Sequence, residues 1–599
     1  MNLDNIGPDG QVLFAYSQLD ESQSTNDISQ ISNEDEEQLP WVRKHFKVIV
    51  SDGKKRRACL VVGCTQTYEF KASHTVLKRH YTNNHKDDML PSKLLFSNEP
   101  HIDAVVKCIV VDKLPYSEVE AKGFKHLWST VALGKRLPSR QEISELVISK
   151  RRDIQELIKK QLEGAPSIGL TFDIWSNRGR THGYGCIMAH FLCSKDILQV
   201  VPLQFAYMPC PHNGESIFQF LHDTIKEYNI QKKVVGITTD NASENPRGIE
   251  QLCQKLQLDL NFSVGFLYFR CAAHVINLAV KESLKPLKEQ IADIRRVIVA
   301  IRGSPKRIQA FDAIQRELLA TMCDSQWTSP LRLKEDVDTR WNSTFAMLER
   351  AHLLRAAIDR ALLEMKDLHD LQISHIDWPV IKAMIVFLEP FNEVTEQLSG
   401  EKYPTISMVN AYLPKLKAHL EQEFDDESIT SAAKAFRNKL DEYEVHIDQP
   451  TAVIATVLDP RFKLTPIPEL ARPFVRDNLL RLLEPVAEAD VSLSQEVRRS
   501  CFQDVYAAAE SDEVKVYLEA LREPKACDIV SYWKLNKLRF PRLYKLAMTV
   551  LPLQATSVSC ERAFSAAGLV DTPRRNKLST DSFGANMLVG MWIRYFNMV

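Results

Sequence analysis

Hydrophobic residues follow two different periods along the chain. Between residues 164 and 265, nine glycines separate short β-branched and aromatic runs such as SIGLTFDIW, YGCIMAHFLC and LQVVPLQFAYM. Such runs predict strands joined by turns. From residue 304 to 567 Gly400 is the single glycine, and apolar residues recur at three- and four-residue spacing in segments such as FAMLERAHLLRAAIDRALLEM. That spacing predicts helices, so we expect an α/β core followed by a large helical block.

Length and composition favour several globular domains inside a cell. With 599 residues, 45% of them apolar and 26% charged, the chain is long enough for about three to five domains. No uncharged apolar run approaches the ~18 residues of a membrane span, so no membrane partner is expected. The first residues, MNLDNIGPDG, have neither the basic nor the apolar segment of a secretory signal. Most of the twelve cysteines stand alone in apolar surroundings, which predicts a reducing, intracellular compartment.

Charge is distributed unevenly, although the formal net charge is only -1. Residues 1 to 40 contain nine acidic residues and no Lys or Arg. Because they are also rich in Ser, Asn and Gln, we expect residues 1–36 to form an acidic, disordered tail. Residues 41 to 86 contain eleven basic and two acidic residues, a net charge of +9. A module of that charge is typical of a phosphate-binding surface, and a solvated basic face is the alternative.

Two cysteines and two histidines in this basic segment have the spacing of a zinc site. Cys59 and Cys64 are separated by four residues, His80 and His85 by four, and the two pairs by fifteen. The spacing predicts two thiolates after a strand and two imidazoles one helical turn apart, which together bind a structural Zn²⁺. The metal is needed because so short a segment buries too little apolar surface to fold alone.

The zinc ligands, the aromatic residues ahead of them and the basic helix KASHTVLKRHYTNNH resemble the BED-type zinc finger. We place this finger at residues 37–92. The resemblance implies that one face of its helix contacts DNA, through Lys71, His74 and Lys78. Four residues, rather than the common two, separate the cysteines, which is within the tolerance of the motif. Residues 93–162, with helical spacing in EISELVISKRRDIQELIKKQL, are expected to form a helical linker and DNA-binding region.

Two carboxylates follow predicted strands of the α/β core. Asp173 follows the run IGLTF, and Asp240 follows VVGITT. Loops at strand ends are where α/β folds place chemistry. If the two strands are neighbours, the carboxylates lie side by side, and a cation such as Mg²⁺ would offset their repulsion. For either residue taken singly, capping a turn or the helix that begins at NASEN is the more common role.

Several motifs, in order, resemble the hAT superfamily of DNA transposases over roughly residues 40 to 599. They are TFDIWS, TTDNASEN, CAAHVINL, DTRWNST, LSGEKYPT, ATVLDPRFK and the C-terminal stretch containing SVSCERAFS. The resemblance implies a multidomain α/β plus α protein, in which a ribonuclease-H-like core is interrupted by an all-helical insertion. We assign residues 163–285 to the first part of the core and 286–520 to the insertion. Residues 521–599 would complete the core and carry the hAT C-terminal dimerisation region, so a homodimer or higher oligomer is expected.

The resemblance also implies a catalytic triad that binds two Mg²⁺ or Mn²⁺ ions, formed by Asp173, Asp240 and Glu561. These ions would support phosphodiester hydrolysis and strand transfer without a covalent protein intermediate. The family often has Ser where this chain has Cys560. That difference leaves the acid untouched.

Four further residues have two interpretations each. Arg340 and Trp341 match a family position where the indole stacks on a flipped base and the pair binds DNA. A core Trp at a helix start is the alternative. Cys271 and His274 could bind a metal near the site, but one pair supplies two ligands only, and a packed, hydrogen-bonded His is the alternative. The run LVGMWIRYF resembles part of the dimerisation region, or is simply core.

The leading prediction is a nuclear hAT-type transposase that binds double-stranded transposon ends and target DNA and cuts with metal ions. The competing interpretation is a domesticated relative, a DNA-binding regulator that keeps the fold and the dimer but does not cut. A cellular ribonuclease-H-like nuclease is a third class. It explains neither the finger nor the insertion.

Overall fold

The computed structural model describes most of the chain beyond residue 95 and parts of the N-terminal segment. The described residues are 46–51, 54–59, 66–69, 76–77, 79–80, 96–177, 182–193, 197–257, 267–321, 327–337, 340–371, 376–447, 449–488, 513–571 and 579–596. They belong to two compact units, one within residues 1–95 and one that begins at Phe96.

The first unit contains a small antiparallel sheet. Strands β1 (Phe46–Ser51), β2 (Lys54–Cys59) and β3 (Thr67–Glu69) pair in the order β1-β2-β3. Phe46 lies opposite Cys59 in the register of the first pair. At the other end of that pair, Ser51 lies opposite Lys54.

The second unit is built on a mixed sheet. Its described strands are β4 (Ile168–Ser176), β5 (Gly183–Leu192), β6 (Leu198–Met208), β7 (Val234–Thr239) and β8 (Leu267–Arg270). They lie in the order β6-β5-β4-β7-β8. The first three are antiparallel neighbours, whereas β7 is parallel to both β4 and β8. The strands predicted in this part of the sequence are therefore confirmed.

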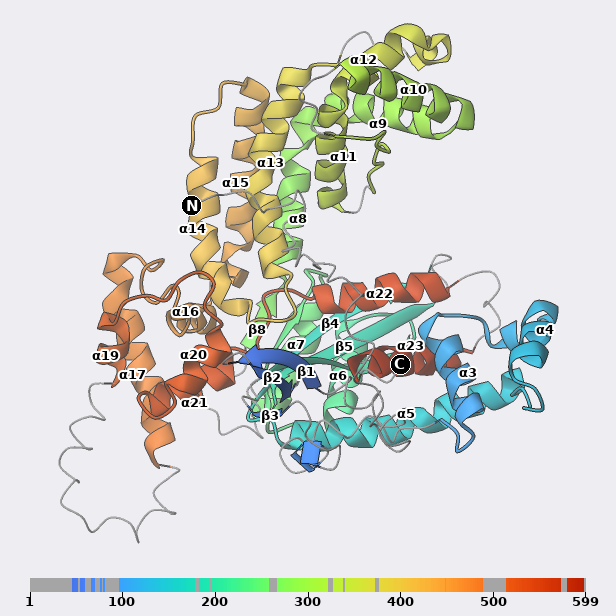
Figure 1. Cartoon of the computed structure of the whole chain (residues 1–599). Helices are drawn as coiled ribbons and strands as arrows, with labels where there is room; N and C mark the ends of the chain where they lie inside the picture. Colours follow the sequence, from blue (N-terminus) through green and yellow to red (C-terminus); the bar gives the residue numbers. More distant parts are fainter. Residues whose placement is uncertain are drawn as a thin grey trace, which may run out of the picture. The chain divides into compact units, whose positions relative to one another are not determined.

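Helices cover both faces of this sheet, which explains why its central strands are nearly continuous apolar runs. On one face lie α6 (Gly214–Glu227) and α7 (Asn245–Gln257), and Phe220 of α6 packs against Phe172 of β4. On the other lie α22 (Val558–Val570) and α23 (Thr580–Tyr595), and Phe583 of α23 packs against Tyr184 of β5. The sheet core is thus closed by helices from the far C-terminal part of the chain (Figure 1).

The helices ahead of the sheet are α3 (Pro100–Val111), α4 (Lys122–Val131) and α5 (Arg140–Glu163), with a 3-10 turn at Tyr116–Glu120. Of these, α3 and α5 pack against α23, and α4 contacts the 3-10 turn. Ser139 caps α5 by accepting a hydrogen bond from the backbone N–H of Glu142. Tyr595 of α23 donates to Gln161 of α5. The helical prediction for residues 100 to 160 is confirmed.

Between β8 and α22, the described residues form helices and short 3-10 turns, with one isolated bridge between Val337 and Arg340. The first group of these helices comprises α8 (Ala272–Ser283), α9 (Lys288–Arg302), α10 (Pro305–Thr321), α11 (Trp341–Leu353), α12 (Arg355–Glu364), α13 (Trp378–Leu398), α14 (Val409–Leu420) and α15 (Glu427–Ile447). The second comprises α16 (Pro450–Val457), α17 (Arg472–Glu488), α19 (Glu513–Glu519), α20 (Ile529–Leu535) and α21 (Pro541–Val550). The two groups are distinct in Figure 1, and the predicted helical block is confirmed.

Among the described helices, none has the combination of length and hydropathy that crossing a bilayer requires.

Candidate active site

Asp173 lies on the central strand of the sheet and faces α22. On its strand, Thr171 bonds to Ser559 and Trp175 stacks on Phe564, both of α22. Because alternate residues of a strand point to the same face, Asp173 between them points toward that helix too. Its carboxylate accepts a hydrogen bond from the backbone N–H of Ile174 at 2.8 Å.

Asp240 directly follows the neighbouring parallel strand. Phe172 and Thr239 are register partners, so the next residue of each strand, Asp173 and Asp240, lies at the same edge of the sheet. The condition set by the sequence, that the two strands be neighbours, is met. Oδ1 of Asp240 also accepts from the N–H of Ala242 at 3.2 Å and from the side-chain amide of Asn245. Asp240 therefore also makes the capping contacts that the alternative interpretation predicts.

Glu561 reaches this edge from the first turn of α22, which contacts β4 and β5. A buried polar chain attaches that turn to the sheet. The Thr171 hydroxyl lies 2.9 Å from the Ser559 hydroxyl and 3.1 Å from Nε2 of His190, and Cys560 Sγ donates to the Thr171 carbonyl at 3.5 Å. These bonds fix the residues immediately before Glu561.

The three acids share one electrostatic neighbourhood. Burial raises the pKa of Asp173 well above its usual range, and the negative charges of Asp240 and Glu561 raise it further. Burial lowers the pKa of His274, while the same two carboxylates act in the opposite direction. The charges of Asp240 and Glu561 therefore act on both Asp173 and His274, which brings residues from four separate segments into one neighbourhood. Asp173, Asp240 and Glu561 are called the acidic edge below.

The acidic edge has the donor chemistry of a Mg²⁺ or Mn²⁺ site. Its oxygens are the hard ligands that these ions prefer, and the repulsion that raises the pKa of Asp173 is the repulsion that a cation would relieve. Within the described residues, however, no three His, Cys, Asp or Glu side chains already converge as a metal-binding group. The Oδ1 atoms of both aspartates are engaged with nearby N–H groups instead.

Cys271 and His274 lie at the start of α8, beside this edge. The N–H of Cys271 donates to the carbonyl of Thr239 at 2.7 Å, and its sulfur accepts from the N–H of Ser557 at 3.4 Å. Burial raises the pKa of the Cys271 thiol to about 12, so it stays protonated at neutral pH. Cys271 therefore packs between β7 and the segment before α22 and links the two by hydrogen bonds. His274 is a neighbour of the acids.

Arg340 and Trp341 begin α11. The guanidinium of Arg340 lies 3.4 Å from the hydroxyl of Ser565, one helical turn beyond Glu561 on α22. Trp341 is only 3% exposed and lies beside Phe345. Its indole is covered in this conformation, as the core alternative predicts. Arg340 instead lies beside α22, the helix that carries Glu561.

The residues LSGEKYPT and ATVLDPRFK have structural roles that the sequence did not reveal. Arg562, next to Glu561, forms an ion pair with Glu401 and donates to the carbonyl of Ser399. Thr405 bonds to Gln554 at 2.9 Å, so the loop 398–405 holds the segment leading into α22. In the second motif, buried Asp459 binds Arg461 and Ser407. Lys463 of the same motif donates to three carbonyls at the end of α19, those of Tyr517, Ala520 and Leu521.

The predicted finger is only partly within the described residues. Cys59 is the last residue of β2. His80 is helical and buried, and its ring lies 5.2 Å from that of Tyr68. The remaining predicted ligands and DNA contacts lie outside the described residues: Cys64, His85, Lys71, His74 and Lys78.

Comparisons with known proteins match three parts of the chain. Residues 171–264 match the ZBED1 RNase-like domain, residues 269–387 the ZBED1 RNase-like helical domain, and residues 512–593 the hAT family C-terminal dimerisation region. The first match contains Asp173 and Asp240, and the third contains Glu561. The acidic edge is therefore assembled from two separately matched domains.

Whole-chain relatives are distant but extensive. The chain is 24% identical to "Putative AC transposase" of Zea mays, over 81% of this chain and 64% of that protein. It is 25% identical to "Putative transcriptional regulator tpeD" of Talaromyces stipitatus, over 83% of this chain and 62% of that protein. It is 23% identical to "Zinc finger BED domain-containing protein RICESLEEPER 2" of Oryza sativa subsp. japonica, over 93% and 88%. The chain thus spans less than two thirds of the length of the first two.

Proposed function

We propose that the chain is a DNA transposase of the hAT family, as the matched domains and the relatives support. It would bind transposon ends, cleave them with divalent metal ions and transfer the strand to target DNA. The observation that supports this most is the acidic edge, where burial raises the pKa of Asp173 on β4 and the charges of Asp240, after β7, and Glu561, on α22, raise it further. In this proposal the chain folds as a ribonuclease-H-like core in two parts, residues 163–285 and 521–599, around a helical insertion at 286–520. The core would bring the three acids together at the acidic edge.

In this mechanism Asp173, Asp240 and Glu561 would hold Mg²⁺ or Mn²⁺. When bound, such ions activate the attacking water or 3′-hydroxyl and stabilise the leaving oxygen. The polar chain from Thr171 to Ser559 holds the start of α22, and therefore Glu561, against β4. Arg340 is placed beside α22 to neutralise a phosphate of the bound strand. His274, whose pKa is lowered by burial, is a neutral neighbour that can accept a hydrogen bond or a proton.

A cleavage assay on a duplex carrying the element's own ends tests the catalytic assignment. Asp240→Asn and Glu561→Gln keep the size of each side chain but remove its charge, so cleavage should fall by about 10²–10³-fold while binding of the ends persists. Glu244→Gln, at an exposed acid four residues from Asp240, is the matched control and should cleave normally. Full activity in either acid variant would remove that residue from the site.

The same assay decides the second candidate function, a DNA-binding regulator that does not cut. One relative that bears a regulator's name favours this candidate. A wild-type protein that binds the ends but never cleaves them, with Mg²⁺ or with Mn²⁺, would establish the regulator and reject the transposase. Nuclear localisation is expected for both.

We also propose that residues 37–92 form a BED-type finger with a structural Zn²⁺ bound by Cys59, Cys64, His80 and His85. Zinc would stabilise this small module, and Lys71, His74 and Lys78 would contact DNA. The full-length protein should contain one zinc per chain by metal analysis, and the double variant Cys59→Ser/Cys64→Ser should contain none. A wild-type protein without zinc would contradict the finger.

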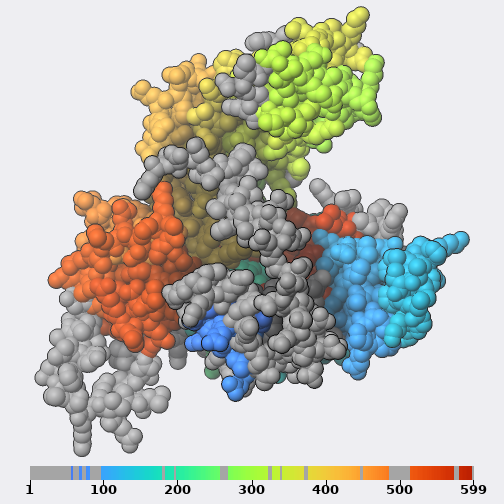
Figure 2. Space-filling view, in the orientation of Figure 1, coloured from blue at the N-terminus to red at the C-terminus, as the bar shows by residue number. Residues whose placement is uncertain are grey.

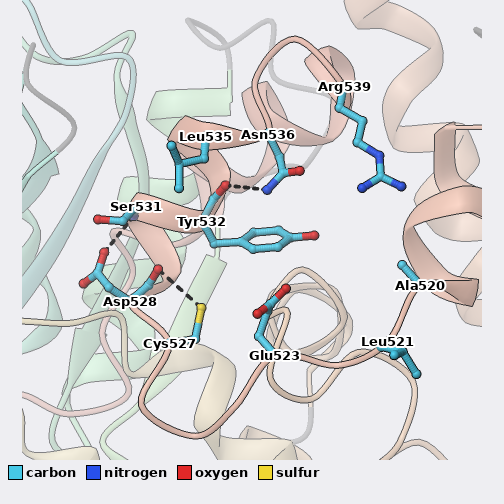
Figure 3. Close-up of a pocket in the computed structure, with 10 residues that line it drawn as sticks. All are labelled: Ala520, Leu521, Glu523, Cys527, Asp528, Ser531, Tyr532, Leu535, Asn536 and Arg539. Carbon is cyan, nitrogen blue, oxygen red and sulfur yellow. Dashed lines mark hydrogen bonds between the residues drawn. The ribbon is translucent and has the colours of Figure 1, made fainter.

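We propose a homodimer formed through exposed leucines of the matched dimerisation region. Leu521, Leu535 and Leu538 are 92%, 85% and 96% exposed. The first two line a pocket of about 360 Å³ beside α20 (Figure 3). The segment that carries them forms part of the surface in Figure 2. By contrast, most of the run LVGMWIRYF is buried in α23, as the core alternative predicted.

Light scattering tests this surface. Three Leu→Ser substitutions at 521, 535 and 538 should convert a dimer to a monomer, because burial of exposed leucines drives association. Leu363→Ser and Leu470→Ser, at exposed leucines outside the matched region, should not. A wild-type monomer at micromolar concentration would reject the dimer.

A further inference from the structure

A second charged site lies in the helical block, away from the three acids. A cavity of about 220 Å³ is lined by residues of α8, α9, α11 and the turn between α8 and α9. Its charged lining is entirely basic: Lys281, Lys285, Lys288 and Arg295. Its apolar wall is formed by Leu284, Ile291 and Trp341. We call it the basic cavity.

Most of this positive charge is available for a ligand. Arg295 is already neutralised by a bidentate pair with Asp336, at 2.6 and 2.7 Å. Lys285 pairs with Glu282 at 2.8 Å, but both side chains are exposed, so the pair is weak. Within the described residues, Lys281 and Lys288 take part in no ion pair. Two to three lysine charges therefore face solvent around one opening without a fixed counter-charge.

A buried donor supplies a second, independent indication of a ligand. Trp341 lines the cavity and is 3% exposed, yet its indole N–H has no hydrogen-bond partner among the described residues. An unsatisfied buried N–H costs about 1–3 kcal/mol, which is why nearly all such groups are paired in native proteins. Two other buried tryptophans show the usual pairing: the indole N–H of Trp533 donates to Leu458 O, and that of Trp592 donates to Pro202 O. An acceptor in the cavity would satisfy the Trp341 donor.

We propose that the basic cavity binds a backbone phosphate of DNA, with Lys281, Lys285 and Lys288 as cationic contacts and the Trp341 indole N–H as a hydrogen-bond donor. A phosphate matches both halves of the site, because it is an anion and also an acceptor. The proposal rests on the DNA-binding function proposed above and gives Trp341 a polar role that differs from base stacking.

The position of the cavity fits a strand that also reaches the acidic edge. Lys281 lowers the pKa of His274, while Asp240 and Glu561 raise it. His274 therefore lies within electrostatic reach of both sites, and α8 carries both His274 and Lys281. A strand with its scissile phosphate at the acids would place a nearby phosphate at the lysines.

The experiment measures binding of fluorescein-labelled DNA, as duplex and as single strand, by full-length protein in EDTA, where no cleavage occurs. The triple variant Lys281→Gln/Lys285→Gln/Lys288→Gln should bind about tenfold more weakly at 0.1 M salt. The slope of log affinity against log salt should also fall by ~0.7–0.9, since the variant loses one phosphate contact. The matched control, Lys306→Gln/Lys366→Gln/Lys382→Gln, removes the same charge from exposed lysines of the same helical block.

Trp341→Phe tests the donor, because it keeps an aromatic ring for stacking but removes the N–H. Its affinity for the same DNA should fall about three- to tenfold with an unchanged salt slope. Unchanged melting of each variant shows that it is folded, and Trp341→His, which restores a ring N–H, is the second variant should Phe destabilise the helix.

The outcomes separate this proposal from the proposed function. If wild type binds no DNA, the function itself fails. If wild type binds DNA and the cavity triple loses no more affinity than the control triple, the basic cavity is overturned. If unlabelled inorganic phosphate at millimolar concentration displaces DNA from wild type but not from the cavity triple, DNA and free phosphate compete for the same lysines, which supports the proposal. If phosphate stabilises wild type against melting more than the cavity triple but displaces no DNA, the site binds free phosphate alone, and the strand assignment is overturned.

Discussion

The acidic edge and the basic cavity are clusters of opposite charge that are built in opposite ways. At the edge, Asp173 is half-buried on a central strand, and its environment opposes ionisation. At the cavity, Lys281, Lys285 and Lys288 are exposed on helical surface, and their charge is stabilised by water. The difference follows from what each site would hold. A divalent metal ion is held by converging carboxylate oxygens in a fixed geometry, whereas a DNA phosphate is exchanged rapidly and remains partly hydrated.

The two regions also differ in how their buried polar groups are satisfied. Beneath α22, Thr171, His190 and Ser559 form a connected chain of hydrogen bonds. Such a network rigidifies the helix that carries Glu561. In the basic cavity the Trp341 donor is left without a partner within the described residues. The first region is a connected network, although Nδ1 of His190 also has no hydrogen-bond partner within the described residues.

The largest expected effect tests the acidic edge itself. Asp173→Asn should lower cleavage by about 10²–10³-fold, because a carboxamide cannot replace a full negative charge at a metal site. In EDTA the same variant should melt at a higher temperature than wild type, because the repelled, desolvated charge is gone. Mn²⁺ should then raise the melting temperature of wild type but not of the variant. A variant that is less stable than wild type in EDTA would show that repulsion at the edge is not significant.

Part of the acidic edge could be predicted from the sequence, and part of it could not. The apolar runs predicted β4 and β7 with an aspartate at or past the end of each. Asp240 does follow β7, but Asp173 lies within β4, which continues to Ser176 through its pairing with β5; the parallel β4–β7 pair still brings the two residues to one edge. Glu561 could not be placed from local pattern, because it reaches the edge only when a helix far along the chain returns to the sheet. Its assignment depended on the family resemblance.

The remaining residues could not be predicted for a different reason. Thr171, His190 and Ser559 are ordinary in sequence, and their significance comes from burial against one another. The basic cavity is formed by helices separated by other helices, so the row of lysines gives no sign of the Trp341 donor beside it. Charge counts over segments are too coarse to detect such an arrangement.

A pair of tryptophan substitutions compares a buried indole N–H that has a hydrogen-bond partner with one that has none among the described residues. The Trp592 indole donates to Pro202 O at 2.7 Å under the sheet, so Trp592→Phe loses a bond and leaves a buried carbonyl unpaired. It should destabilise the protein by about 2–3 kcal/mol. Trp341→Phe removes a donor that has no partner among the described residues, and should cost about 1 kcal/mol or less. Calorimetric melting in the absence of DNA measures both, and equal losses would contradict the distinction.

The pH dependence of stability tests the polar chain beneath α22. Burial lowers the pKa of His190 to about 3, from an ordinary value of 6.5. Below pH 6.5 the unfolded chain gains a proton that the folded protein does not, so stability falls as pH falls. At pH 5 the loss should be about 2 kcal/mol relative to pH 8.

The matched variant for this test is His190→Gln, which can keep the bond to Thr171 but does not titrate. Melting followed between pH 8 and pH 5 should show a smaller loss than in wild type. His369→Gln, at an exposed histidine, should follow wild type. An identical pH dependence in His190→Gln and wild type would mean that His190 is accessible to protons in the folded state.

The smallest expected effect is a gain of function. Removing an acid from the acidic edge should greatly reduce cleavage, but removing the acid that pairs with Lys285 should strengthen DNA binding. The pair between Glu282 and Lys285, at 2.8 Å, competes with phosphate for the same ammonium group. Exposed pairs of this kind contribute about 0.2–1 kcal/mol, so Glu282→Gln should raise DNA affinity roughly two- to threefold at low salt. The gain should vanish near 0.5 M salt, because screening weakens the original pair and the new contact alike.

Glu317→Gln, at a carboxylate that pairs with Arg360 away from the cavity, should leave affinity unchanged. If both variants gain equally, the effect is one of net charge, and Lys285 has no special access to the DNA.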